Sequence, residues 1–530
     1  MKIPQEIIAI VKKLEEAGFK AYLVGGCVRD LVLSEVEGLP IKPKDWDITT
    51  DAKPEEIQKI FSRGEAETLT ENVGAAYKTV YENKFGTISL ITDSEDETLK
   101  TVEITPFRLE GKYTDKRHPD EIKFARTVEE DLGRRDFTIN ALALKLETYN
   151  MKPETKNKGF KLQTSSFKII DPFAGEKDLK NKIIRTVGEP EERFNEDALR
   201  LMRASRLAVE LGFEIEEKTG KAVQKLASTL EFISKERIRD EFAKLLMTER
   251  AASGIEILEN LGLLKYVLPE LREGINVIGV TKKKKEHIKY EELTVFEHHL
   301  KTLDYAAKKN FNLVLRLAAL LHDLGKPRTK KGEGLEATFK GHEQVGTKLT
   351  IQALERLHFS KKIIEQTANL VRWHFFFYNV DEVTEAGVRR LIRRVGPENI
   401  DDLLLLREAD RSGSGLPKIS PYRLKHLRYM IERVSRDPIH PKMLKVKGND
   451  VMEILKILAG PKVGWILNIL LEEVLDNPEK NDKNYLIEQV KKLGRLSDEE
   501  LKELAEKSVE KKEELEGEID EEMRKKHGVY

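Results

Sequence analysis

Two glycines and two aspartates near the N-terminus have the types and spacing needed for chemistry on a phosphate. Gly25 and Gly26 follow an apolar run in LVGGCVRD, and without side chains they let backbone amides approach a polyphosphate closely. Asp45 and Asp47 follow in KDWDITT. In a strand, residues two positions apart point to the same face, so both carboxylates can bind one cation or a close pair. These are components of phosphoryl or nucleotidyl transfer.

Arg29 lies between the two pairs, where its guanidinium can clamp one phosphate. Taken alone, a Gly-Gly pair is often only a tight turn and an Asp-x-Asp pair only the end of a strand. Their combination resembles the first motif of the class II tRNA nucleotidyltransferases and poly(A) polymerases, which is LVGGxVRD followed by DxD on the next strand. The spacer SEVEGLPIKPK, within an insertion at 31–44, contains Gly and Pro and is predicted to be a loop.

The segment RRDFTINALA at 134–143 is similar to the second motif of this family, which contacts ribose and triphosphate. A salt-bridged surface pair is the alternative for its two arginines. The resemblance implies nucleotide-binding roles for Arg134, Arg135, Asp136 and Asn140.

Two further segments resemble the family. Glu103 lies on a predicted strand that would neighbour the two aspartates, so it is a candidate third carboxylate near the metal, or else part of a structural ion pair. The segment 110–124 resembles the family's flexible loop. DPFAGEKDL at 171–179 resembles its third motif, a hinge that is also a Pro/Gly turn capping a helix.

The charged segment EDALRLMRASR at 196–206 has the residue types needed to select a nucleobase. Its spacing predicts one helix with Asp197 and Arg200 three residues apart, and with Arg203 and Arg206 on the same face. The simplest interpretation is a charged face with internal ion pairs. However, a carboxylate accepts from the amine of cytosine or adenine, whereas guanine and uracil would leave Asp197 unpaired.

The same segment resembles the family's EDxxRxxR motif. By that resemblance Asp197 and Arg200 select CTP and ATP, while Arg203 and Arg206 hold the phosphates or support the base-selecting residues. SKERIRDEFAKLL at 234–246 is similar to the family's next helix, which supports them.

Histidines gather in the middle of the chain, where six of the 11 lie between 298 and 374. A lone histidine is usually a surface or core residue, but a His-Asp pair with a distant aspartate suits a divalent metal with open positions for phosphate and water. The region resembles an HD phosphohydrolase domain. The implied ligands are His298, His322, Asp323 and Asp410, with His342 and His374 for a second metal and a divalent transition metal as a candidate ion. His299 is the less suitable first ligand because the family pattern is EHxL. The alternative is a degenerate HD domain that acts only as a scaffold.

Composition sets the broad class. The 530 residues exceed what one hydrophobic core accommodates, so several domains are expected. Basic and acidic residues balance at 93 each, which still allows one basic face to bind nucleic acid. Cys27 is the only cysteine, which excludes internal disulfides and fits a reducing compartment. We expect a cytoplasmic protein with no membrane segment, because no run reaches the roughly 18 apolar residues that a spanning helix needs.

The expected fold class is α+β, with a polymerase-β-like nucleotidyltransferase head followed by all-helical neck, HD and tail domains. Strands are predicted near 78–83, 87–92, 100–109 and 121–126, and helical spacing dominates from about 176 onward. The predicted domains are a head at 1–175, a helical neck at 176–280, an HD domain at 281–420, a tRNA-binding tail at 421–497 and a charged tail at 498–530. The Lys-rich segment 150–168 is predicted to be an exposed insertion.

The family resemblance implies a CCA-adding enzyme, with Mg²⁺ at Asp45 and Asp47 and with tRNA, ATP and CTP as partners. Poly(A) polymerase and CC-only or A-only enzymes share the same motifs. The basic insert of the poly(A) branch is not visible after Asp47, and the intact segment 110–124 argues against a CC-only enzyme. Two other classes stay open: an HD phosphohydrolase with a vestigial head, and a nonenzymatic RNA-binding scaffold.

Overall fold

The structure is a computed structural model. It describes residues 2–61, 78–81, 86–110, 122–153, 160–283, 290–333, 337–376, 383–414, 421–435 and 437–506. The chain divides into two compact units, each described by itself. One comprises Met1–Thr248 and Ser253–Val267, and the other Glu249–Ala252 and Leu268–Tyr530. Most of the predicted flexible loop, the tip of the 150–168 insertion and most of the charged C-terminal tail lie outside the described residues.

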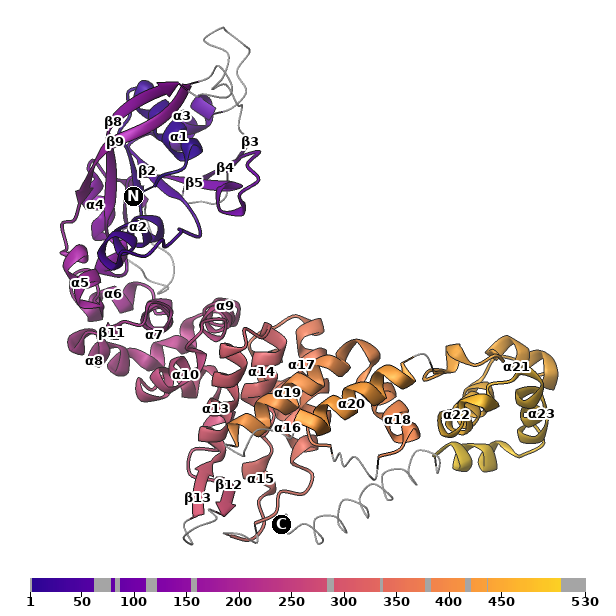
Figure 1. The fold of residues 1–530 in the computed structure, drawn as a ribbon. Coiled ribbons are helices and arrows are strands. Elements are labelled where there is room, and N and C mark those ends of the chain that lie inside the picture. The colour runs from indigo at the N-terminus through magenta and orange to yellow at the C-terminus, as the bar shows by residue number, and fades with distance from the viewer. Residues whose placement is uncertain are drawn as a thin grey trace. The chain divides into compact units, whose positions relative to one another are not determined.

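The first unit is built on a seven-stranded mixed sheet with the strand order β3-β4-β5-β2-β1-β8-β9 (Figure 1). Its strands are β1 (Ala21–Val24), β2 (Asp47–Thr50), β3 (Lys78–Tyr81), β4 (Ile88–Ile91), β5 (Thr101–Pro106), β8 (Ala143–Pro153) and β9 (Phe160–Ile170). A separate antiparallel pair joins β6 (Arg108–Glu110) to β7 (Ile122–Phe124). In the central part of the sheet, β2 runs parallel to β5 and antiparallel to β1. The predicted strands and the α+β class are therefore confirmed.

Helices with one apolar face accompany this sheet. In α1 (Gln5–Glu16), Ile7, Ile10 and Leu14 recur at helical spacing and are completely buried. The others near the sheet are α2 (Gly26–Glu37), α3 (Pro54–Phe61), α4 (Val128–Gly133), the 3₁₀ turn η2 (Thr138–Asn140) and α5 (Gly175–Asn181).

The rest of the first unit is helical. Its elements are α6 (Pro190–Glu196), α7 (Leu199–Leu211), α8 (Glu217–Leu226), the 3₁₀ helix η3 (Ala227–Phe232), α9 (Lys235–Leu246), α10 (Ala251–Asn260), whose first two residues are assigned to the second unit, and α11 (Leu264–Val267). A short parallel pair of β10 (Ile183–Ile184) and β11 (Glu214–Ile215) lies among them.

The described residues of the segment 150–168 lie in strands β8 and β9. Two local expectations need correction. Helix α2 continues to Glu37, so the first part of the predicted loop is helical, and the helix ends where Gly38 adopts φ 66°. Asp197 precedes α7 in an extended conformation, where its Oδ1 accepts a hydrogen bond from Leu199 N at 3.0 Å. An aspartate at this position caps the exposed amides of the helix N-terminus, which favours the break.

The second unit begins with α12 (Pro269–Arg272) and the β12–β13 hairpin (Ile278–Lys283 and Tyr290–Thr294). The helices that follow are α13 (Val295–Lys308), α14 (Leu313–Leu321), α15 (Lys326–Thr329), α16 (His342–Arg356), α17 (Lys361–Trp373), α18 (Glu385–Val395), α19 (Ile400–Gly413) and α20 (Pro421–Val434). The last part contains α21 (Gly448–Leu455), α22 (Pro461–Asp476) and α23 (Lys483–Leu493), with 3₁₀ turns η5 (Pro397–Asn399), η6 (Pro441–Met443) and η7 (Pro478–Lys480).

One continuous apolar cluster runs through this unit. It extends from Ala306 and Leu315 in the α13–α14 region to Leu486 and Val490 in α23. Among the described residues, no helix is both long enough and apolar enough to cross a membrane.

Candidate functional site

The turn between β1 and α2 is shaped by two glycines. Gly25 has φ 78°, and a Cβ added there would lie 2.9 Å from Arg135 Nη1 and 3.3 Å from Asp47 Oδ2. A Cβ at Gly26 would lie 3.5 Å from Asp45 Oδ1. Glycine is therefore required at position 25 by conformation and by space. The turn leads into the N-terminus of α2, whose amides favour an anion.

Three carboxylates lie beside this turn. The parallel register of β2 and β5 places Asp47 opposite Glu103, and Asp45 precedes Asp47 by two residues. Burial raises the pKa of Asp47 to about 7, with further contributions from the charges of Asp45 and Glu103, while Arg135 opposes the rise. Three neighbouring carboxylates of this kind form a set of oxygen donors suited to a divalent cation.

The predicted phosphate-binding arginines differ in their surroundings. Arg29 Nη2 would lie 3.7 Å from a Cβ at Gly26, and its Nη1 donates to Asn140 Oδ1 at 3.0 Å. Arg135 also lies at the turn, with its Nη1 2.9 Å from the position that a Cβ of Gly25 would occupy. Arg134 instead donates from Nε to Asp131 Oδ1 at 2.9 Å. Arg29 and Arg135 therefore lie beside the glycine turn, where Arg29 also pairs with Asp30 at 2.7 Å. Arg134 pairs with Asp131, which is completely buried.

The base-selecting pair predicted from sequence lies at the start of α7. Asp197 accepts two hydrogen bonds from Arg237 of α9, at 3.1 and 2.7 Å. Arg200 is buried, and its guanidinium donates to Glu196 and to the carbonyls of Arg193 and Arg134. Sequence analysis did not single out Arg237, although it lies within the segment 234–246 that was expected to support this pair.

The two later arginines of α7 are each held between carboxylates. Arg203 Nε donates to Asp136 Oδ2 at 2.7 Å, and its Nη1 lies 3.8 Å from Glu241. Arg206 Nε donates to Glu241 at 2.6 Å and its Nη1 donates to Glu210 at 2.5 Å. The interpretation of this helix face as a set of internal ion pairs therefore holds for these two residues.

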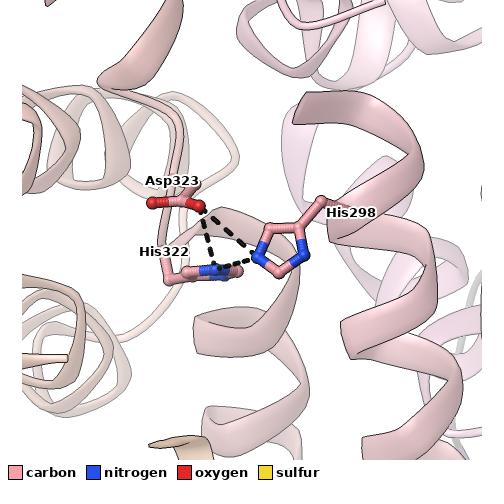
Figure 2. A group of neighbouring side chains, drawn as sticks. All are labelled: His298, His322 and Asp323. Carbon is pink, nitrogen blue, oxygen red and sulfur yellow. Dashed lines mark hydrogen bonds and ion pairs between the residues drawn. The ribbon is translucent and has the colours of Figure 1, made fainter. Parts of the chain in front are cut away.

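In the second unit, the histidines and aspartates predicted as metal ligands converge. Figure 2 shows His298 of α13 facing His322 and Asp323, with the two Nε2 atoms 3.0 Å apart and Asp323 Oδ2 within 3.5 Å of both. Asp410 Oδ1 of α19 lies 3.2 Å from His298 Nε2 and 3.7 Å from His322 Nε2.

A second pair of histidines approaches the other oxygen of the same aspartate. His342 Nε2 and His374 Nε2 lie 3.4 and 3.5 Å from Asp323 Oδ1. Asp323 thus divides its two oxygens between two sets of ligand atoms, and both sets have the geometry of a metal site. Within the described part of the chain, His342 Nε2 and Asp323 Oδ1 are buried and form no hydrogen bond. Such donors fit a divalent metal.

Backbone carbonyls orient three of these rings. Nδ1 of His322, His342 and His374 lies 3.0, 2.8 and 2.7 Å from the carbonyl oxygen three residues earlier. If Nδ1–H donates to the carbonyl, the lone pair of Nε2 is directed into the cluster, as metal-binding histidines require. Burial lowers the pKa of His342 to about 3. Burial also opposes protonation of His322, but the two aspartates outweigh it and raise its pKa to about 9.

The residues around the cluster explain how it is assembled. Gly325 allows the turn after Asp323 to pack on α16, since a Cβ there would lie 2.0 Å from the carbonyl oxygen of His342. Lys326 Nζ lies 2.7 Å from Asp323 Oδ2. His299 is buried outside the ligand set, and its ring packs edge-on to His322 with centroids 5.3 Å apart.

Known proteins resemble this chain over most of its length. Three family models match the chain: "Poly A polymerase head domain" at residues 21–185, "Probable RNA and SrmB- binding site of polymerase A" at 212–275, and "HD domain" at 295–412. The chain is 34% identical to the CCA-adding enzyme of Ligilactobacillus salivarius over 93% of this chain and 98% of that protein. It is 36% identical to an A-adding tRNA nucleotidyltransferase of Deinococcus radiodurans, over 67% and 76% of the two chains.

Solved structures of CCA-adding enzymes also align with most of this chain. The Bacillus stearothermophilus CCA-adding enzyme in complex with CTP aligns with a TM-score of 0.63 and 28% identity, covering 93% of this chain and 98% of that chain. The Thermotoga maritima CCA-adding enzyme complexed with tRNA is 20% identical, has a TM-score of 0.50, covers 92% and 94% of the two chains and shares the fold. From the full-length similarity and the matching head domain, the chain belongs to the family of class II tRNA nucleotidyltransferases and poly(A) polymerases, as a member that carries an HD domain.

Proposed function

We propose that this protein is a CCA-adding enzyme, which transfers CMP, CMP and AMP from CTP and ATP to the 3′ end of tRNA. The observation that carries this proposal is a connection within the first unit. In the segment 134–140, Arg135 lies beside the turn at Gly25 and its charge acts on Asp47, while Arg134 and Asp136 accept hydrogen bonds from Arg200 and Arg203 of the base-selecting helix. One segment thereby joins the proposed metal site and phosphate-binding turn to the proposed base-selecting pair. The full-length similarity to the L. salivarius CCA-adding enzyme supports the same activity.

In this proposal Asp45 and Asp47 hold Mg²⁺, and Glu103 completes the set of oxygen donors. When bound, Mg²⁺ would supply Lewis acidity that favours the ionised 3′ hydroxyl and neutralises the leaving pyrophosphate. The raised pKa of Asp47 fits this role, because a cation relieves the repulsion among the three carboxylates. The triphosphate would be held by Arg29, Arg135 and the amides after Gly25. The 3′ oxygen then bonds to the α-phosphorus as the bond between the α-phosphorus and the oxygen bridging to the β-phosphate breaks.

Base selection is assigned to Asp197 and Arg200. Arg237 donates to both carboxylate oxygens of Asp197, so both oxygens act as hydrogen-bond acceptors. Cytosine N4 and adenine N6 offer the matching amine, whereas uracil O4 and guanine O6 would face an acceptor with another acceptor. A buried polar group left without its partner disfavours the wrong base.

The test is to incubate the protein with tRNAs that end before the first C, after C and after CC, each with single labelled nucleotides, and to sequence the product ends. Growth that stops at CCA supports the proposal. Long A-tails would identify a poly(A) polymerase. Addition of A only to tRNA ending in CC would identify an A-adding enzyme, as its D. radiodurans relative is named, and growth that stops at CC would identify a CC-adding one.

We also propose a second activity, a metal-dependent phosphohydrolase in the HD domain. It is favoured by the two buried ligand sets that share Asp323, including His342 Nε2 and Asp323 Oδ1 without hydrogen bonds among the described residues. A degenerate scaffold does not need such a set. The assay is hydrolysis of 2′,3′-cyclic AMP and of bis(p-nitrophenyl) phosphate with Mn²⁺, Co²⁺ or Ni²⁺ added to EDTA-treated protein. Absence of turnover with every metal would contradict this activity.

A further inference from the structure

Asp131 is completely buried, although its side chain is acidic. It lies on α4, whose N-terminus is held by a capping box between Thr127 and Glu130. Arg134 and Arg135 follow Asp131 by three and four positions, so helical spacing returns both guanidinium groups to its carboxylate. A buried carboxylate needs such partners, because without them its removal from water is strongly unfavourable.

Asp131 also contacts the strand that carries a proposed metal ligand. Its Oδ1 accepts from Arg134 Nε at 2.9 Å, and the first backbone amide of β6 donates to the same oxygen at 3.3 Å. Its Oδ2 accepts from Thr49 Oγ1 at 3.4 Å and lies 3.8 Å from Arg135 Nη2. Thr49 lies two positions after Asp47 on β2, so these two side chains share a face of the sheet. One buried carboxylate thus contacts both β2 and the arginine that lies at the glycine turn.

Arg135 directs the two ends of its guanidinium to different groups. Its Nη2 lies toward Asp131, whereas its Nη1 lies 2.9 Å from the position that a Cβ of Gly25 would occupy and donates to the carbonyl oxygen of Asn140 at 3.5 Å. Because a guanidinium is planar and rigid, holding one of its ends also sets the direction of the other. An arginine oriented before the phosphate arrives loses less freedom when it binds.

We infer that Asp131 is a positioning residue, which holds the Arg135 guanidinium toward the phosphate-binding turn and acts on the nucleotide through this arginine. The inference rests on the proposed function and adds a residue that the sequence motifs did not single out. The triphosphate is the same in CTP and ATP, so loss of the Asp131 charge should weaken the binding of both nucleotides equally. Base selection at Asp197 and Arg200 should stay unchanged.

The test is Asp131→Asn, which removes the charge and keeps the size of the side chain. KM and kcat are measured for CTP and UTP on tRNA lacking CCA, and for ATP on tRNA ending in CC. Inorganic tripolyphosphate is added as a competing inhibitor, because it offers the phosphates without ribose or base. We expect KM for CTP and ATP and the inhibition constant of tripolyphosphate to rise together by about tenfold, with an unchanged ratio of UTP to CTP use.

Arg135→Gln and the double variant show whether the two residues act as one unit. If Asp131 acts through Arg135, the double variant should have the same KM as Arg135→Gln alone. Asp131→Glu keeps the charge on a longer side chain, so its two constants should lie between those of wild type and Asp131→Asn.

Asp178→Asn is the matched control. Asp178 is also a buried aspartate of the first unit that pairs with an arginine, since it accepts from Arg185 Nε at 3.0 Å and from Thr138 Oγ1 at 2.7 Å. Its replacement should lower the unfolding temperature while leaving KM and the inhibition constant of tripolyphosphate unchanged.

Three results would overturn the inference. One is a lower unfolding temperature with both constants unchanged, as expected of the Asp178 control. Another is a rise in KM that multiplies with that of Arg135→Gln, which would show independent action. The third is a changed UTP-to-CTP ratio, which would show that Asp131 acts on the base-selecting helix through Arg134, whose carbonyl oxygen accepts from Arg200 at 3.2 Å.

If Asp131→Asn does not fold, Asp131→Glu decides by the same two constants, and a rise in neither of them would overturn the inference. Both constants are independent of the fraction of active protein, so a partial loss of folded protein does not affect the comparison. A wild-type protein that adds no nucleotide would instead contradict the proposed function.

Discussion

At the scale of single residues, the surroundings of Asp47 explain why it suits a metal site and why its ionised form lowers the stability of the fold. Burial and the neighbouring charges of Asp45 and Glu103 raise its pKa to about 7. Without a cation the ionised form is therefore unfavourable in the folded protein at neutral pH. The ionised form becomes favourable when a divalent cation replaces the proton. The carboxylates that bind metal therefore lower the stability of the metal-free folded protein.

The raised pKa of Asp47 predicts that, in EDTA, the unfolding temperatures of wild type and Asp47→Asn differ by an amount that depends on pH. A carboxyl whose folded pKa lies above its unfolded value of 3.8 loses stability as pH rises from about 4 to about 7. The neutral variant should therefore unfold at a higher temperature than wild type at pH 8, and the gap should close towards pH 5. Thermal unfolding followed by circular dichroism measures the gap. A gap that does not change with pH would contradict the assignment.

Gly25 is the second residue whose role is argued from its immediate surroundings. Gly25→Ala combines φ 78° with a Cβ 2.9 Å from Arg135 Nη1. We expect about 1–3 kcal/mol of destabilisation, because the φ 78° and ψ −137° of Gly25 are largely restricted to glycine. We also expect a loss of about tenfold or more in kcat/KM, because Arg135 and Asp47 must move. Nucleotide addition and thermal unfolding are the measurements.

Gly38→Ala separates these two effects. Gly38 has a similar φ of 66°, but a Cβ there would meet nothing within 4 Å. Gly38 adopts the left-handed helical conformation, so Gly38→Ala should lose about 1–2 kcal/mol of stability with unchanged kcat/KM. Equal losses of activity in both variants would show that backbone strain, and not displacement of the site, limits the enzyme.

At the scale of elements, close helix crossings bring metal ligands together. Gly413 on α19 allows this helix to approach α13, since a Cβ there would lie 2.2 Å from Thr302 Oγ1 and 2.8 Å from Thr302 N. The crossing places Asp410 of α19 beside His298 of α13 at 3.2 Å. The glycine therefore fixes the distance between two ligands that lie more than a hundred residues apart in the sequence.

Gly413→Ala should consequently lower the affinity of the HD cluster for Mn²⁺ or Co²⁺ and destabilise the second unit by about 1–3 kcal/mol. Calorimetric titration with each metal and thermal unfolding measure the two effects. Gly464→Ala is the control, because a Cβ at this position in α22 meets nothing within 4 Å. It should raise stability by up to about 1 kcal/mol and leave metal binding unchanged. Unchanged metal affinity in Gly413→Ala would contradict the role of the crossing.

At the scale of the whole molecule, the two proposed activities use separate residues in two compact units, each with its own core. The carboxylates of the head belong to the first unit and the histidine cluster to the second.

Asp45→Ala should lower nucleotide addition by at least about a thousandfold, because a bound metal contributes several kcal/mol to transition-state stability. It should leave hydrolysis of 2′,3′-cyclic AMP unchanged. His322→Ala should have the reverse effect. Both assays on both variants form the measurement. Nucleotide addition that survives in Asp45→Ala would exclude the head as its source.

The sequence by itself determined what depends on local spacing. The glycine turn, the paired aspartates and the helical spacing of α1 and α7 follow from residue order, because strand and helix periodicity decide which side chains share a face. The family expected from these motifs is confirmed by the full-length relatives. Locally, the helical content of the spacer and the capping position of Asp197 were missed, since a C-terminal glycine and an N-terminal aspartate can shift a boundary within a charged segment.

Only the tertiary structure decided which distant residues meet. Asp197 meets Arg237, which lies 40 positions later, and Asp136 meets Arg203, which lies 67 positions later. The two oxygens of Asp323 also lie near two pairs of histidines, of which His322 is its neighbour in sequence and the other three come from elsewhere in the chain. Sequence spacing carries no record of such pairings, because they arise when buried faces pack and each buried charge must find a partner.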